Sequence, residues 1–113
     1  MKKITVRFYK SSLGNEPVKD WLISLCRDDK RIIGEDIKMV EFGWPLGMPL
    51  VRKMDKDLWE VRSDITSREI ARVMFTVKNG LMVLLHGFKK KSESTPPNDL
   101  KIAKDRRDRV LND

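Results

Sequence analysis

Hydrophobic and polar residues alternate along several short stretches of the chain, and this period of two predicts β-strands. The first such stretch is residues 3–10, where Ile4 and Phe8 stand among more polar neighbours. An Asn-Gly pair at residues 79–80 predicts a tight β-hairpin, because its turn needs positive φ at both positions. The other predicted strands are residues 51–54, 58–63, 70–78 and 81–86.

Apolar residues recur at helical spacing in three further stretches. Two helices are predicted in the first half of the chain, at about residues 17–26 and 29–43. A third helix follows a polar connector at residues 92–97 and ends near Leu111. The order β-α-α-β-β-β-β-α predicts an α+β fold with a curved, mainly antiparallel sheet and helices packed on one face.

Length, charge and cysteine content narrow the class of protein. The 113 residues predict one domain, residues 1–113. A net charge of +7 predicts an anionic partner such as nucleic acid, an acidic protein or a membrane surface. The single cysteine, Cys26, excludes an internal disulfide and fits a reducing compartment. No apolar run reaches the roughly 20 residues of a membrane span, so we expect a cytoplasmic protein.

The surplus of positive charge lies mainly in one part of the chain. Residues 51–91 carry ten basic and five acidic side chains, whereas residues 92–113 carry five of each. The predicted sheet is therefore the expected place of anion binding.

Strand alternation assigns charged residues to faces of this sheet. If the Asn-Gly pair forms the turn, counting outward places Gly87 opposite Arg72. Arg72 then shares a face with Leu85 and Lys89. His86 falls on the other face unless a bulge at Gly87 reverses the alternation.

The neighbouring hairpin is expected to place Arg62 opposite Arg72, because this register also pairs two aromatic residues. Like charges directly opposite each other destabilise a sheet, so two arginines in these positions indicate an anion site. A phosphate suits the planar guanidinium fork. The alternative is that Glu60 and Glu69 neutralise the arginines as ordinary surface ion pairs.

Residues of the last predicted strand offer proton transfer or nucleic-acid contacts. His86, the only histidine, either moves protons or is a hydrogen-bonded residue at a strand end. Lys89, Lys90 and Lys91 form either a solvated basic edge or, beside Phe88, a surface for a nucleic-acid backbone. The three tryptophans are predicted to pack in the core.

The chain lacks the residue sets of metal and nucleophile chemistry. One cysteine and one histidine cannot build a structural zinc site, and no Gly-rich phosphate loop, Ser-His-Asp order or HExxH motif occurs. We therefore expect no metal and no cofactor. The reaction that suits such a basic set is RNA cleavage by the adjacent 2′-OH, in which cations stabilise the phosphorane-like transition state.

Three segments in order resemble the HigB-type toxins of the RelE/ParE superfamily, a group that includes phage-derived killer-like proteins. The segments are LWEVR at residues 58–62, ARVMF at 71–75 and LLHGFKKK at 84–91, with a Thr-Pro pair downstream. The resemblance covers nearly the whole chain and implies a RelE-like fold. It also implies the toxin of a type II toxin–antitoxin system, a metal-independent mRNA endoribonuclease that acts on the 70S ribosome and inhibits translation. The implied partner is a helix-turn-helix antitoxin, HigA-like, encoded alongside.

The same resemblance implies roles for individual residues. Arg62 and Arg72 match the arginines that contact the scissile phosphate in these toxins, and we predict Lys90 and Glu60 as the other catalytic residues. Glu60 is either the general base or the partner of Arg62. RNA contacts are implied for Lys89 and Lys91, which match the family's basic segment after the last strand. We also predict RNA contacts for Phe88, His86, Lys53 and Lys56.

The chain departs from the ribosome-dependent relatives at two places. They carry lysines where this chain has Leu58 and Glu60, and some use a tyrosine or histidine near the C-terminus, where no such residue follows His86. The general base is therefore not transferable. Two other functions stay open: a ParE-like inhibitor of DNA gyrase, and a non-catalytic RNA-binding protein.

Overall fold

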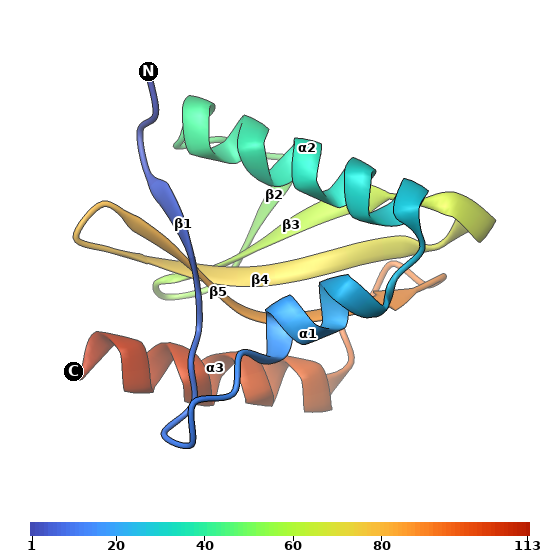
Figure 1. Cartoon of the computed structure of the whole chain (residues 1–113). Coiled ribbons are helices and arrows are strands. Elements are labelled where there is room, and N and C mark those ends of the chain that lie inside the picture. Colours follow the sequence, from blue (N-terminus) through green and yellow to red (C-terminus); the bar gives the residue numbers. More distant parts are fainter.

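The computed structural model describes residues 1–113 and shows a five-stranded mixed sheet with three helices (Figure 1). The strands are β1 (Thr5–Phe8), β2 (Val51–Asp55), β3 (Leu58–Asp64), β4 (Ile70–Lys78) and β5 (Leu81–Lys90). The helices are α1 (Pro17–Ser24), α2 (Arg27–Gly43) and α3 (Pro97–Leu111), and a short 3-10 turn (Thr66–Arg68) joins β3 to β4. The predicted order of elements and the α+β class are confirmed, and the architecture is consistent with a RelE-like fold.

The strands lie across the sheet in the order β1-β5-β4-β3-β2. Three of the four neighbouring pairs are antiparallel, and β1 runs parallel to β5. β1 begins later than predicted because the backbone amides of residues 3 and 4 bond to α2. The Lys3 and Ile4 amides donate to the backbone oxygen of Glu41, and the Val6 amide donates to its carboxylate at 2.8 Å. Helix α2 thereby covers this edge of the sheet.

Helices α1 and α2 cover one face of the sheet with an apolar core. An aromatic cluster joins Phe75 of this core to two partly buried tryptophans. Trp59 stacks on Phe75 with ring centroids 5.8 Å apart, and Trp44 packs edge-on against Trp59 at 4.9 Å. Trp21 packs against the same core from α1. The prediction that the tryptophans are packing residues is confirmed.

Helix α3 lies against the opposite face, so the sheet separates it from α2 in Figure 1. Its Ala103 is fully buried in a smaller apolar cluster with Met74 and Leu85. Two of the three helices thus share one face, and the last one covers the other. The candidate functional residues lie on the face that α3 covers, which we call the α3 face.

The two predicted hairpin registers are confirmed near their turns. Lys78 lies opposite Leu81, and both residues between them have positive φ, 52° for Asn79 and 76° for Gly80. In the neighbouring pair of strands, Arg62 lies opposite Arg72. This register also sets Trp59 against Phe75, as expected from their aromatic pairing.

A β-bulge in β5 changes the register beyond the turn and corrects one prediction. Phe75 lies opposite Leu84 and Met74 opposite His86, so Leu85 has no partner in β4. Arg72 consequently faces Phe88, not Gly87. Because one extra residue reverses the alternation of everything that follows, His86 lies on the α3 face and Lys89 on the other.

Close packing and a hydrogen bond hold the bulge in place. A Cβ atom at Gly87 would lie 2.4 Å from Trp21 Cε3, so only glycine lets α1 approach β5 this closely. On the other face, Arg106 of α3 donates to the Leu85 backbone oxygen at 2.8 Å. Strand β5 also continues to Lys90 instead of ending at His86, since β4 provides partners as far as Ile70.

The longest helix, α2, has 17 residues, and no helix has the apolar length that a bilayer crossing requires.

Candidate functional site

Two arginines from neighbouring strands form the centre of the candidate site. Arg62 in β3 lies directly opposite Arg72 in β4. Residues directly opposite each other in an antiparallel pair project to the same face, so both side chains lie on the α3 face. Glu60, two residues before Arg62, lies on this face as well. The sheet therefore places two cations and one anion side by side.

Arg72 is fully buried beneath the segment that joins β5 to α3. Its guanidinium donates to the backbone oxygen of Ser92 and, at 3.2 Å, to the Thr95 hydroxyl. It also lies over the Phe88 ring, 5.8 Å from the centroid. Burial lowers the pKa of Arg72 below its ordinary value, and the charge of Glu60 raises it in part. Since a guanidinium does not lose its proton in proteins, this site holds a charge with little water around it.

Glu60 is also fully buried and is linked to Arg72 through Thr95. The Thr95 hydroxyl donates to Glu60 Oε2 at 3.0 Å while it accepts from Arg72. Glu60 Oε1 and Arg72 Nε are buried without a hydrogen-bond partner. The site therefore has one acceptor and one donor available, and Glu60 makes no direct ion pair with Arg62.

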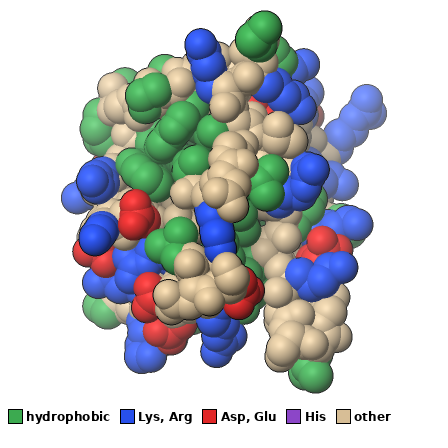
Figure 2. Space-filling view, turned by 90° about the vertical axis from the view of Figure 1, so that its left-hand side faces the viewer, with side chains coloured by type: hydrophobic (Ala, Val, Ile, Leu, Met, Phe, Trp, Pro, Cys, Tyr) green, Lys and Arg blue, Asp and Glu red, His purple; other side chains and the backbone are tan.

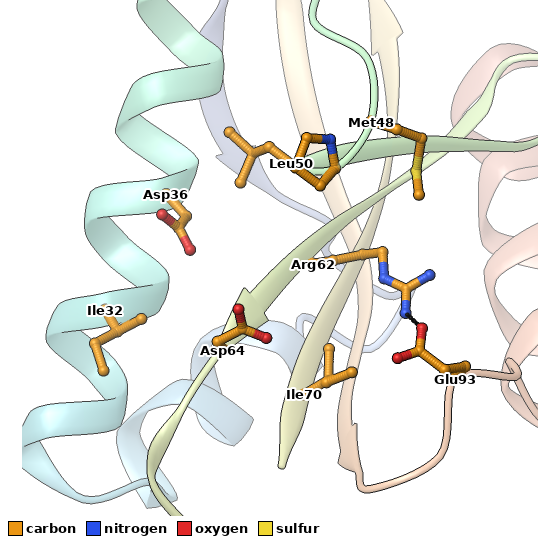
Figure 3. A pocket seen from close by; sticks show the side chains of 9 residues that line it. Ile32, Asp36, Met48, Leu50, Arg62, Asp64, Ile70 and Glu93 are labelled. Atoms are coloured by element: carbon orange, nitrogen blue, oxygen red, sulfur yellow. Dashed lines mark hydrogen bonds and ion pairs between the residues drawn. The ribbon is translucent and has the colours of Figure 1, made fainter. Parts of the chain in front are cut away.

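Arg62 has a different carboxylate partner. Its Nη2 lies 2.6 Å from Glu93 Oε2, and the Arg62 side chain is 10% exposed whereas that of Glu93 is 84% exposed (Figure 3). Both residues border a pocket of about 520 Å³. Ile32 of α2, Leu50 and Ile70 provide its apolar wall. Arg62 can therefore be reached from outside the molecule through the pocket, whereas Arg72 is fully buried and does not border it.

The bulge brings His86 to the face of the site, which is the exception that the sequence left open, although the extra residue is Leu85 and not Gly87. His86 Nε2 lies 2.6 Å from Asp99 Oδ1 at the start of α3. The imidazole stacks on Phe88 with centroids 5.8 Å apart, and Phe88 in turn lies beneath Arg72. The two roles predicted for His86, a hydrogen-bonded residue and a proton carrier, are compatible. A hydrogen bond to a carboxylate also orients an imidazole for proton transfer.

The lysines at the end of β5 divide between the two faces. Lys89 lies opposite Ala71, on the face away from Arg72, and pairs with Glu69 at 3.8 Å. Its predicted position beside Arg72 is therefore wrong, for the same reason as that of His86. Lys90 lies opposite Ile70 at the strand end and is exposed without an ion pair, and Lys91 is exposed directly after it.

Lys53 and Lys56 lie away from the arginine pair. Lys53 stands opposite Trp59, with its Nζ 6.0 Å from the ring, on the face opposite to Arg62. Lys56 lies in the β2–β3 turn, about 20 Å along the strand from Arg62. Figure 2 shows another side of the molecule, where lysine and arginine side chains lie around a patch of hydrophobic ones. Positive charge is therefore widespread, and the paired arginines distinguish the site.

Four residues contact the site although the sequence did not predict a role for them there. Ser92, Glu93 and Thr95 belong to the polar connector, and Asp99 belongs to the first turn of α3. A run of serine, glutamate and threonine is typical of a solvated loop, so its composition gave no signal. The Thr-Pro pair quoted for the family resemblance includes Thr95, but the resemblance did not indicate that Thr95 contacts the site.

The site residues suit anion binding and proton transfer. The guanidinium groups can bind a phosphate oxygen, and Glu60 and His86 can exchange protons. No group of three or more histidine, cysteine, aspartate or glutamate side chains gathers in a way that could hold a metal ion.

A comparison of the sequence with known protein families found one whose profile covers the segment that carries the site. The profile of the phage-derived Gp49-like proteins (DUF891) matches residues 20–108, which include both arginines, the bulge and Asp99. A comparison with curated proteins gave no match. Because the profile spans most of the chain, from α1 to the last turns of α3, the protein belongs to the Gp49-like family of phage-derived proteins.

Proposed function

We propose that the protein is the toxin of a type II toxin–antitoxin system and cleaves mRNA on the 70S ribosome. Membership of a phage-derived family is consistent with a toxin. The proposed partners are an antitoxin with a helix-turn-helix motif, encoded alongside, and the ribosome with its mRNA.

The observation that carries the proposal is the placement of Arg62 directly opposite Arg72 on the α3 face. A packed sheet gains nothing from two opposed guanidinium groups, because like charges in this position repel each other. A phosphodiester between them would remove that repulsion and accept hydrogen bonds from both. In the cleavage reaction, negative charge builds on the non-bridging oxygens, where fixed cations stabilise it most.

Proton transfer in this reaction falls to the acidic and imidazole groups of the site. The 2′-hydroxyl loses its proton to a base as its oxygen attacks phosphorus, and the 5′-oxygen leaves with a proton, which yields a cyclic phosphate. Glu60 has a free oxygen, Oε1, beside the arginines and is the proposed base. His86, oriented by Asp99, is the proposed proton donor to the leaving oxygen. The exposed Lys90 and Lys91 would contact the RNA backbone near the end of β5.

Induced expression in bacterial cells tests the proposal. Wild-type protein should arrest growth, and primer extension should locate cuts in mRNA only when ribosomes are active. Arg62→Ala should abolish both effects, because loss of one transition-state contact costs about 10²–10³ in rate. Arg31→Ala, which removes an arginine that is 59% exposed on α2, is the matched control and should remain toxic.

Two results would overturn the proposal. If DNA replication fails first while mRNA stays intact, the protein is a gyrase inhibitor. If growth continues normally although the wild-type protein accumulates in folded form, the protein is not a toxin.

A further inference from the structure

A short segment covers both arginines of the site, and each contact that it makes uses an oxygen atom. We call residues 92–95 the strap. Its Ser92 backbone oxygen and Thr95 hydroxyl accept hydrogen bonds from Arg72, and its Glu93 carboxylate pairs with Arg62. The strap thus presents to the guanidinium groups the kind of atom that a phosphodiester would present.

The Arg62–Glu93 pair is unequal in its surroundings. The Arg62 side chain is held in the sheet and nine-tenths buried, whereas Glu93 is 84% exposed on a segment between β5 and α3. The pair borders the pocket of about 520 Å³, and the Glu93 carboxylate reaches the guanidinium from one side of it (Figure 3). An exposed carboxylate on a loop adds little to stability, so it can leave Arg62 without loss of the fold.

The groups beneath the strap are not fully satisfied by it. Arg72 Nε and Glu60 Oε1 are buried without partners, although Thr95 bridges the other atoms of these two residues. Buried polar atoms are normally hydrogen-bonded, so a site with a spare donor beside a second guanidinium is built for another occupant. An anion with several oxygens could accept from this spare donor and from the Arg62 guanidinium at the same time.

We propose that Glu93 occupies the place of an RNA phosphate on Arg62, and that RNA binds by displacing this carboxylate together with the strap. The inference rests on the proposed function and adds an intramolecular competitor to it. Glu93 sets how strongly the site holds RNA, because each binding event must first break the Arg62–Glu93 pair. It also keeps weakly bound anions away from the arginines.

Glu93→Gln tests this inference against Glu69→Gln as a matched control. Both variants remove one negative charge near the end of β5, but Glu69 pairs with Lys89 on the other face. The probe is a short single-stranded RNA with 2′-O-methyl groups, which binds but is not cleaved, followed by fluorescence anisotropy at fixed salt. Glu93→Gln should bind it about fivefold more tightly than the wild type, as expected from the upper range for an exposed ion pair. Glu69→Gln should change the affinity by less than about twofold.

A second variant ties the effect to Arg62. In an Arg62→Ala background, Glu93→Gln should no longer raise the affinity above that of Glu69→Gln. Equal affinities of the two single variants, or weaker binding by Glu93→Gln while its thermal unfolding is unchanged, would overturn the inference. A fivefold gain that persists without Arg62 would overturn it too, because the carboxylate then acts through the general field.

Cleavage by the wild-type protein separates this inference from the proposed function. If the wild type cuts mRNA and the affinities do not differ, only the competition by Glu93 is wrong. If the affinities differ as expected and no mRNA is cut, the proposed function fails and Glu93 remains a competitor for an anion on Arg62.

Discussion

The two faces of the sheet are built from the same strands but bury different kinds of side chain. On the face of α1 and α2, Phe75 of β4 is fully buried among tryptophans. Three residues earlier in the same strand, Arg72 is just as fully buried on the α3 face, beside Glu60. Burial of an aromatic ring stabilises the fold, whereas burial of a guanidinium costs free energy unless its hydrogen bonds are made.

The difference shows which part of the sheet holds residues that cost stability. The α3 face has its own apolar cluster, and the charged groups occupy the end of the sheet near the strap. A structural role alone would favour apolar residues at these positions as well, since a well-packed hydrophobic set often replaces buried charges without loss. The comparison therefore makes one face the source of stability and one end of the other face the candidate functional site.

The largest expected effect is on the face of α1 and α2. Phe75→Ala should lower the free energy of unfolding by about 3–5 kcal/mol, because it removes a buried ring and leaves a cavity between two tryptophans. Urea unfolding followed by tryptophan fluorescence measures the change. A loss below about 1 kcal/mol would show that this core is looser than its burial indicates.

The second prediction separates stability from activity on the α3 face. Arg72→Met should lower mRNA cleavage about 10²–10³-fold, because it removes a cation from the transition state. It should also destabilise the fold, since Glu60 remains buried beside an apolar side chain. The double variant Arg72→Met/Glu60→Gln should recover the free energy of unfolding and stay inactive. Recovery of both properties together would mean that neither Arg72 nor Glu60, the proposed base, is needed for cleavage.

The third prediction concerns the contact between α1 and the bulged strand. Gly87→Ala should lower the free energy of unfolding by about 1–3 kcal/mol, because the new methyl group overlaps the Trp21 ring. Gly34→Ala is the matched control: no atom lies within 4 Å of its added Cβ in helix α2, so it should raise stability by up to about 1 kcal/mol. Thermal unfolding of both variants checks the signs. A neutral Gly87→Ala would show that α1 can move away from β5 at little cost.

The smallest expected effect is on the pH dependence of stability, and it compares one carboxylate on each side of the sheet. A hydrogen bond from Arg107 holds the pKa of Asp55 below its ordinary value, and one from Thr66 does the same for Asp29. A lowered folded-state pKa gives stability that is fully present above the unfolded value, about 3.9, and is lost as pH falls through the folded-state value. Asp55→Asn and Asp29→Asn should each be less stable than the wild type at pH 7.

The deficit of each variant should shrink as the pH falls below about 4, where the wild type loses the same contribution. Asp20→Asn, on an exposed turn of α1, is the control and should follow the wild-type curve. Unfolding midpoints from pH 7 to 2 measure the difference. A deficit that stays constant over this range would assign the effect to packing.

The strand order of the second half of the chain and the Arg62–Arg72 pairing could be predicted because the sequence carries explicit signals for them. The Asn-Gly turn sets one hairpin, and the aromatic residues Trp59 and Phe75 set the other. Each signal lies within one pair of neighbouring strands, so it can be recognised without knowledge of the rest of the fold. The tryptophan core follows from composition in the same way.

A bulge at Gly87 was an open possibility, but its presence and its place at Leu85 could not be predicted because the neighbouring residues hide the alternation. Residues 82–85 are Met-Val-Leu-Leu, and all four are buried, two on each face. A run that is apolar at every position gives no measure of parity, so a one-residue shift leaves no trace in it. The positions of His86 and Lys89 were wrong for this reason. The strap was missed because its role arises only from tertiary contact.

The unpaired residue of β5 also bears on how this family can change. Deletion of Leu85 would leave Leu84 and His86 opposite the same residues of β4, so every later position of the strand would keep its face. Deletion of Gly87 would instead place Phe88 opposite Val73, on the face of α1, where Trp21 leaves no space for a Cβ atom. A codon can thus be lost at the bulge without turning the site over, whereas a loss just after it directs an aromatic ring into α1.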